Sequence, residues 1–189
     1  MRSIIPHRSL AHRYALALWD VASENKVVQE VYNDMFLFTK VASENPEFRR
    51  VMVSEVIPER KKFQVFKAIF EKHITPITLS FSQLVIENGR QNISLSIAAE
   101  YIDLYKSYFR IFDITLRTAI PLRQEDKALL LEKLQPVIKG TVNIEEEIDP
   151  DLIGGFQVMY EDYVFDASVK RELERFRQEF MINLFEKQY

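Results

Sequence analysis

The 189-residue sequence contains no cysteine and only four glycines. Without cysteine the chain forms no disulfide, has no thiol for catalysis and offers no thiolate to a zinc ion. A glycine-rich phosphate loop needs several spaced glycines between a strand and a helix, and this spacing does not occur. The scarcity of these two residue types therefore removes whole classes of functional site.

Long apolar runs and an excess of basic residues are also missing. No apolar run approaches the roughly 18 residues that would predict a membrane-spanning helix. The 25 Lys and Arg residues against 28 Asp and Glu residues give a formal net charge of -3, so the chain lacks the positive surplus that binds phosphate backbones and is not expected to bind nucleic acid. The basic opening, residues 1–15, has too short an apolar part for a signal peptide, and we interpret it as the mature start.

Helical periodicity is what the sequence has in abundance. Apolar residues return every three or four positions from residue 9 to residue 109, and the gaps between these segments hold Pro, Asn and Gly. This pattern predicts six helices, at residues 9–25, 27–45, 46–55, 58–73, 74–89 and 93–109. Six helices joined by short connections indicate a bundle.

The periodicity changes after Tyr108. Apolar and polar residues now alternate in two segments, which is typical of half-buried strands. The pattern predicts a strand, a helix, a second strand, a hairpin and a last helix, at residues 110–120, 123–140, 141–149, 155–167 and 168–189. In the last helix Val169, Leu173, Phe176 and Phe180 share one apolar stripe.

The expected fold class is mainly α with a smaller α+β part. An N-terminal six-helix bundle over residues 1–107 is followed by a small C-terminal domain of a short sheet and helices over residues 108–189. No tract rich in Gly, Ser or Pro lies near the boundary. We therefore expect a continuous helix rather than a flexible linker between the two domains.

Two of the four glycines are neighbours, Gly154 and Gly155, and they follow the turn-forming pair Asp149-Pro150. Because they lead out of a turn and into a strand, we interpret them as a bulge or a close backbone approach, and a ligand loop is the less favoured alternative. Asp149 and Pro150 are expected to shape the turn rather than to hold a metal ion.

No arrangement of side chains in the sequence supports catalysis. His7, His12 and His73 have neither the spacing of a metal-binding pair nor an evident nucleophile to activate. Within the run Glu145–Glu147, Glu146 falls on the inward face of a strand, and a solvated edge with one misplaced carboxylate is favoured over a cation site. We expect no catalytic residue, no metal, no cofactor and no small-molecule substrate.

Two helices carry more apolar surface than a core requires. At about 100° per residue, the apolar side chains of the helix at 9–25 cover an arc of roughly 200°, and those of the helix at 74–89 cover a similar arc. Either both helices are central in the bundle, or each leaves a flank free and the two form a groove for a partner's amphipathic helix. The groove hypothesis selects as anchors Tyr14, Ala17, Leu18, Val21, Phe81, Leu84 and Val85. Tyr14 and Leu18 are also candidates for the core, because helical angle alone does not say which flank faces inward.

Three stretches of the sequence resemble one protein family. They are HRYALALWDVASEN at 12–25, LVIENGR at 84–90 and IDPDLIGGFQVMYEDYVFDASVKRELERFR at 148–177. In order and spacing they are similar to the patterns of the delta subunit of bacterial F-type ATP synthase, called the oligomycin-sensitivity-conferring protein (OSCP) in mitochondria. The chain departs from the family pattern at Glu161-Asp162, where the family has Gly-Asp, and at Ala167, where it has Gly. We therefore expect a hairpin turn that lacks its usual glycines.

The resemblance implies a non-catalytic subunit that links the static peripheral stalk to the catalytic head, so that rotor torque is resisted. In the family the N-terminal bundle binds the N-terminal helix of an alpha subunit between its first and fifth helices, and the C-terminal domain meets the b subunits. One copy per complex, at the cytoplasmic face of the bacterial inner membrane, is expected. The alternative hypotheses are an unrelated helical adaptor that binds an amphipathic peptide helix and, less favoured, a small hydrolase.

Overall fold

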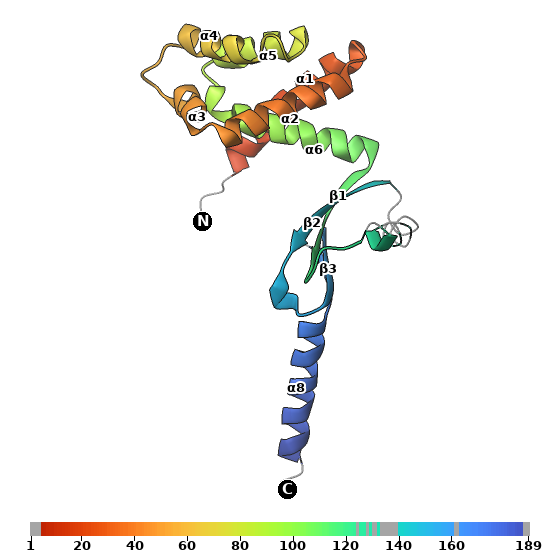
Figure 1. Ribbon diagram of the computed structural model, residues 1–189. Helices are drawn as coiled ribbons and strands as arrows, with labels where there is room; N and C mark the ends of the chain where they lie inside the picture. The colour runs from red at the N-terminus through yellow and green to blue at the C-terminus, as the bar shows by residue number, and fades with distance from the viewer. Residues whose placement is uncertain are drawn as a thin grey trace. The chain divides into compact units, whose positions relative to one another are not determined.

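The computed structural model describes residues 5–123, 125–127, 129, 132, 140–160 and 163–186, without the side chains of 5–9 and 181–186. The chain divides into two compact units, Met1–Tyr108 (unit 1) and Phe109–Tyr189 (unit 2). Figure 1 shows that unit 1 consists of helices, whereas unit 2 combines a sheet with helical segments.

Unit 1 is a bundle of helices with short connections. Its elements are α1 (Ile5–Glu24), α2 (Val28–Glu44), α3 (Pro46–Val53), α4 (Glu59–Phe70), α5 (Pro76–Glu87), the 3-10 helix η1 (Gln91–Ile93) and α6 (Ser94–Phe109). The six helices predicted from the periodicity are confirmed. Proline begins α3 and α5, where its missing N–H removes no intrahelical hydrogen bond.

The core of unit 1 receives apolar side chains from every one of these helices. Its centre is aromatic: Phe38, Phe48, Phe66 and Phe70 pack with ring centroids 4.7 to 6.1 Å apart. Tilted and edge-to-face pairs of this kind contribute about 0.5–1.5 kcal/mol each beyond the apolar area that they bury. The core therefore joins helices that are distant in sequence.

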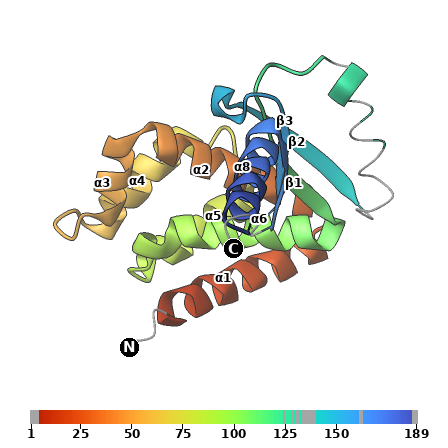
Figure 2. The same ribbon diagram turned by 90° about the horizontal axis from the view of Figure 1, so that it is seen from below.

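The helices α1 and α6 lie side by side (Figure 2). The ring of Trp19 packs against that of Tyr101 at 5.7 Å, and His12 Nδ1 lies 2.9 Å from a carboxylate oxygen of Glu100. Tyr101 is fully buried, and its hydroxyl donates a 3.2 Å hydrogen bond to the carbonyl of Val28. Burial, with added effects of neighbouring ionisable groups, raises the pKa of Tyr101 above its ordinary value, so the hydroxyl stays a donor.

A buried carboxylate fixes the start of α5. Asp34 of α2 accepts hydrogen bonds from the backbone N–H of Thr75 at 2.9 Å and from its hydroxyl at 2.8 Å. Thr75 in turn caps α5, because its Oγ1 accepts the N–H of Thr78. The first turn of α5 is therefore held against α2.

The end of α5 is fixed by a Schellman motif. Gly89 has a positive φ of 67°, which glycine adopts without steric cost. Its N–H donates to the carbonyl of Ile86 and the N–H of Arg90 donates to that of Val85, both at 2.9 Å. Hydrogen bonds therefore hold the backbone at both ends of α5.

Unit 2 contains a four-stranded sheet in the order β2-β1-β3-β4. Its elements are β1 (Ile111–Thr118), β2 (Thr141–Ile148), the 3-10 helix η2 (Pro150–Leu152), β3 (Gly155–Tyr160), β4 (Tyr163–Ser168) and α8 (Val169–Glu186). The strand β1 pairs in parallel with β2, and β3 is antiparallel to both β1 and β4. A parallel pair requires a crossover connection. Most of the predicted helix at 123–140 in that connection lies outside the described residues, although residues 125–127, 129 and 132 are described and helical. The predicted turn at Glu161-Asp162 also lies outside them.

The two faces of β1 differ as the alternation predicts. Ile114, Leu116 and Thr118 are buried on one face. On the other face Arg117 Nε donates to Glu147 of β2 at 2.6 Å, and Asp113 accepts from the side-chain amide of Asn143 at 3.0 Å. The period of two therefore identified the inner face of this strand correctly.

Candidate functional site

The flanks of α1 and α5 meet at one ring contact. Tyr14 and Phe81 pack edge to face with their ring centroids 6.3 Å apart, and both side chains are half-buried. Ala17 follows Tyr14 by three residues, and Leu84 follows Phe81 by three residues, so each stays on the flank that its ring marks. We call the exposed residues Ala17, Val21 and Leu84, together with the half-buried Tyr14 and Phe81, the α1–α5 strip.

The structure divides the predicted anchors between this strip and the core. Leu18 is 1% exposed and Val85 2% exposed, so the prediction that these two side chains contact a partner is wrong. Each follows its ring residue by four positions, which turns it about 40° towards the core, whereas a step of three turns the side chain about 60° the other way. Val21 and Leu84 remain 45% and 49% exposed.

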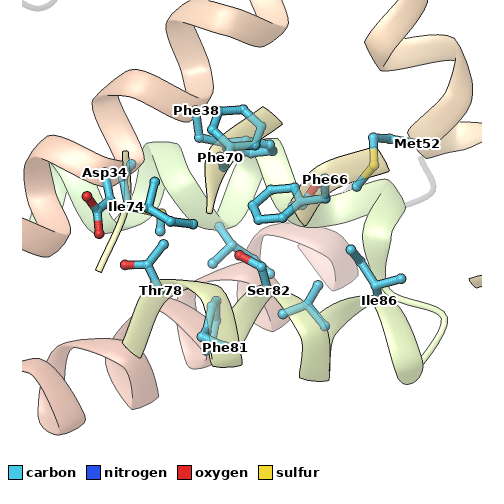
Figure 3. A pocket seen from close by; sticks show the side chains of 14 residues that line it. Asp34, Phe38, Met52, Phe66, Phe70, Ile74, Thr78, Phe81, Ser82 and Ile86 are labelled. Atoms are coloured by element: carbon cyan, nitrogen blue, oxygen red, sulfur yellow. The ribbon is translucent and has the colours of Figure 1, made fainter. Parts of the chain in front are cut away.

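A cavity lies beneath α5 (Figure 3). Thr78, Phe81 and Ser82 of α5 line one side of it, and Phe38 and Phe66 are among the residues opposite. Its volume is about 30 Å³. Sites for small molecules are usually about 300–1,000 Å³, so this cavity is a packing gap rather than a ligand site.

The turn before β3 brings two backbones together. Asp149 Oδ1 accepts the N–H of Asp151 at 3.1 Å, and Pro150 begins η2. Gly155 has a φ of +73°, and a Cβ at this position would lie 2.2 Å from the carbonyl oxygen of Ala167. The structure therefore places Gly155 where a side chain has no room, as expected of a close backbone approach.

The neighbouring Gly154 connects this turn to α8. Its carbonyl oxygen accepts the N–H of Val169 at 3.0 Å, and a Cβ on Gly154 would lie 3.1 Å from a methyl carbon of Val169. Just before the pair, Ile153 has a φ of +66° and is 64% exposed. A branched residue rarely adopts this conformation, and no sequence pattern predicted it here.

Ala167 does not occupy a turn, contrary to the expectation based on the family pattern. It lies in β4, where it pairs with Phe156 of β3, and its φ is not positive. An L-residue fits an extended strand without strain. Alanine at this position, where the family pattern has glycine, therefore causes no backbone strain.

The carboxylate of Glu146 has two partners. It accepts the backbone N–H of Leu122 at 2.8 Å and forms an ion pair with Lys127. The pKa of Glu146 lies below its ordinary value. The hydrogen bond from Lys127 is the largest cause of this shift, and the hydrogen bond from the backbone N–H of Leu122 is the next. The Glu146 carboxylate, which the sequence pattern placed on the inward face of its strand, thus binds the segment that follows β1.

The helix α8 exposes its apolar stripe. Val169, Leu173, Phe176 and Phe180 are between 38% and 68% exposed. We call these four residues the α8 stripe. The sequence periodicity predicted this stripe. An apolar stripe on a helix normally faces a core, but the structure leaves the α8 stripe exposed.

A polar recess of about 440 Å³ lies at the start of α8. Asp166 and Glu172 line it together with Arg171, Arg175 and Ser168, so its charges balance and favour neither an anion nor a cation. Among the described residues no group of three or more His, Asp or Glu side chains could hold a metal ion. None of the described helices combines the length and apolar character that crossing a membrane requires.

Comparison with known proteins identifies the family. The model of the family described as ATP synthase delta (OSCP) subunit matches residues 10–180. An ATP synthase subunit delta of Moorella thermoacetica is 33% identical over 167 residues, which are 88% of this chain and 93% of the relative. One from Paulinella chromatophora, of the organellar chromatophore, is 32% identical over 88% of this chain and 92% of its own.

A solved structure shares the fold. A chain of the mitochondrial ATP synthase hexamer of Toxoplasma gondii superposes with a TM-score of 0.68 and 21% sequence identity, over 91% of this chain and 97% of its own. The resemblance predicted from the three motifs at 12–25, 84–90 and 148–177 is confirmed, and this chain belongs to the ATP synthase delta (OSCP) subunit family.

Proposed function

We propose that this structural, non-catalytic ATP synthase subunit links the alpha subunits of the catalytic head to the b subunits of the peripheral stalk. Unit 1 would bind the head, and unit 2 the stalk. One copy would act in each complex as a peripheral component at the cytoplasmic face of the bacterial inner membrane. The link resists the torque that the rotor applies to the head, so its function lies in binding rather than in chemistry.

The observation that carries the head contact is the α1–α5 strip. Ala17, Val21 and Leu84 are exposed beside the edge-to-face pair of Tyr14 and Phe81. An amphipathic helix places anchors at i, i+3, i+4 and i+7 and fits such a strip between two helices. Because α5 is fixed at both ends, the strip is already formed before the partner arrives, which lowers the entropic cost of binding.

The head contact is tested with a synthetic peptide of the alpha subunit's N-terminal helix. Ala17→Asp or Leu84→Asp places a carboxylate on the strip, and we expect each to weaken binding more than tenfold, about 1.4 kcal/mol, in calorimetry. Neither side chain is buried, so circular dichroism and the fluorescence of the single tryptophan, Trp19, should not change. Unchanged affinity in both variants would remove the strip from the head contact.

Leu16→Asp is the matched control for these variants. Leu16 neighbours Ala17 but is turned about 100° from it around α1, on the side away from Tyr14, and it is 39% exposed. The same charge placed there should change peptide affinity less than twofold, because it lies outside the strip. A loss as large as that of Ala17→Asp would show that added charge, rather than position, weakens the complex.

A further inference from the structure

The α8 stripe has the spacing of a coiled-coil seam. Its residues follow one another at four, three and four positions, so Val169 and Phe176 take d positions of a heptad while Leu173 and Phe180 take a positions. In Figure 1 most of α8 extends beyond the end of the sheet. The stripe is therefore a seam without its second helix in the described part of the chain.

Charged residues of opposite sign border the stripe. Lys170 and Arg177 directly follow the two d residues, whereas Glu172 and Glu179 directly precede the two a residues, and all four are exposed. These are the e and g positions, whose charges select the partner in helix pairs. Arg175 lies 3.8 Å from both Glu172 and Glu179, on the side of them that is farther from the stripe. One border is thus basic and the other acidic.

We infer that α8 binds one amphipathic helix of the peripheral stalk, whose own apolar seam has an acidic row along one side and a basic row along the other. The acidic row faces Lys170 and Arg177, and the basic row faces Glu172 and Glu179. The inference rests on the proposed function, which supplies the stalk as the partner. An anionic lipid surface fits less well, because a helix that binds it carries basic residues on both borders.

The seam is tested on the full chain with the purified soluble part of the b subunits from the same ATP synthase. Leu173→Asp places a charge in the centre of the stripe, and we expect affinity to fall more than tenfold in a fluorescence titration. The side chain is already exposed, so folding should be unaffected, as checked by circular dichroism. Val65→Asp on α4 exposes the same charge in unit 1 and should leave affinity within twofold.

The borders are tested by a matched pair of charge reversals. Glu179→Lys lies beside the stripe and should weaken binding about threefold to fivefold at low salt, an effect that salt near 1 M suppresses. Glu174→Lys makes the same chemical change on the same helix but farther from the stripe, and it should change affinity less than twofold. Arg177→Glu, on the opposite border, should weaken binding about as much as Glu179→Lys.

The possible results separate this inference from the proposed function. If the unchanged chain does not bind the b subunits, the proposed function fails. If it binds them, and Leu173→Asp and Glu179→Lys bind equally well, the stalk contact lies elsewhere and only the inference is overturned. Sedimentation of the chain alone must show a monomer, because a dimer that Leu173→Asp dissociates would mean that a second copy occupies the stripe, which also overturns the inference.

Discussion

The two units use apolar residues in opposite ways. In unit 1 every helix contributes to one buried cluster, although side chains such as Ala17, Phe36 and Leu84 stay exposed on its surface. In unit 2 the sheet buries one face of β1, but α8 presents its whole stripe, and Phe165 of β4 is 63% exposed. The helices of a bundle can cover one another, whereas α8 extends beyond the end of the sheet, where no other described element of unit 2 covers it (Figure 1). The described part of unit 2 therefore leaves its apolar stripe on α8 uncovered.

The units also differ in how much space surrounds a glycine with positive φ. Gly89 of unit 1 has a positive φ, and a Cβ added there would have no atom within 4 Å, whereas at Gly155 of unit 2 a Cβ would collide with the carbonyl of Ala167. Both glycines have a positive φ. At Gly89 only the local turn requires glycine, whereas at Gly155 the pairing of β3 with β4 requires it as well.

The largest expected effect is the loss of stability on substitution of Gly155, which tests the contrast between the two glycines. Gly155→Ala must either separate β3 from β4 or shift the turn, because Cβ and the Ala167 oxygen cannot lie 2.2 Å apart. We expect unit 2 to lose about 3 kcal/mol or more of unfolding free energy. Hydrogen exchange of the β3 and β4 amides measures the loss.

Gly89→Ala is the control for that substitution. It meets no atom, so only the left-handed conformation opposes the methyl group, at about 1–2 kcal/mol. Trp19 reports this loss by fluorescence, because it is the only tryptophan and lies in unit 1. Equal losses from the two substitutions would contradict the close approach at Gly155.

A smaller effect concerns a lysine in the interior of unit 1. Lys62 on α4 is only 1% exposed, and the ion pairs of the described residues, such as Lys67 with Glu71 on the same helix, do not include it. Burying a charged group without a counter-ion is costly, so Lys62→Met should stabilise unit 1 by about 1 kcal/mol, seen as a higher Tm by Trp19 fluorescence. Lys61→Met, at the exposed neighbouring position, should stay within about 0.5 kcal/mol. A destabilised Lys62→Met would show that the ammonium is satisfied.

The smallest effect concerns the edge of the sheet in unit 2. The pKa of Glu146 is lowered, so its contribution to stability is present above the ordinary glutamate value of 4.5 and is lost as the pH falls through the lower folded value. Glu146→Gln should therefore remove part of the acid-induced loss of protection at the β2 amides. Glu145→Gln, on the other face of β2, should retain it. Identical acid profiles for all three chains would contradict the role of the Lys127 and Leu122 contacts.

Local patterns predicted the elements of this fold well. Capping and breaker residues such as Pro46 and Gly89 act on the backbone within a few positions, so they mark helix ends without tertiary information. The alternation around Ile114 and Leu116 identified the inner face of β1 for the same reason. The stripe on α8 was also visible in the sequence, although its exposure was not.

The sequence by itself determined the helices, the strands, the family motifs and the relative angles of side chains around α1 and α5. Only the tertiary structure decided that Leu18 and Val85 face the core while Ala17 and Leu84 face outward. The helical period fixes side chains relative to one another, but neighbours from distant segments fix how the whole helix is rotated. The same holds for Gly155, whose requirement comes from the carbonyl of Ala167, twelve positions away in the chain and adjacent only after folding.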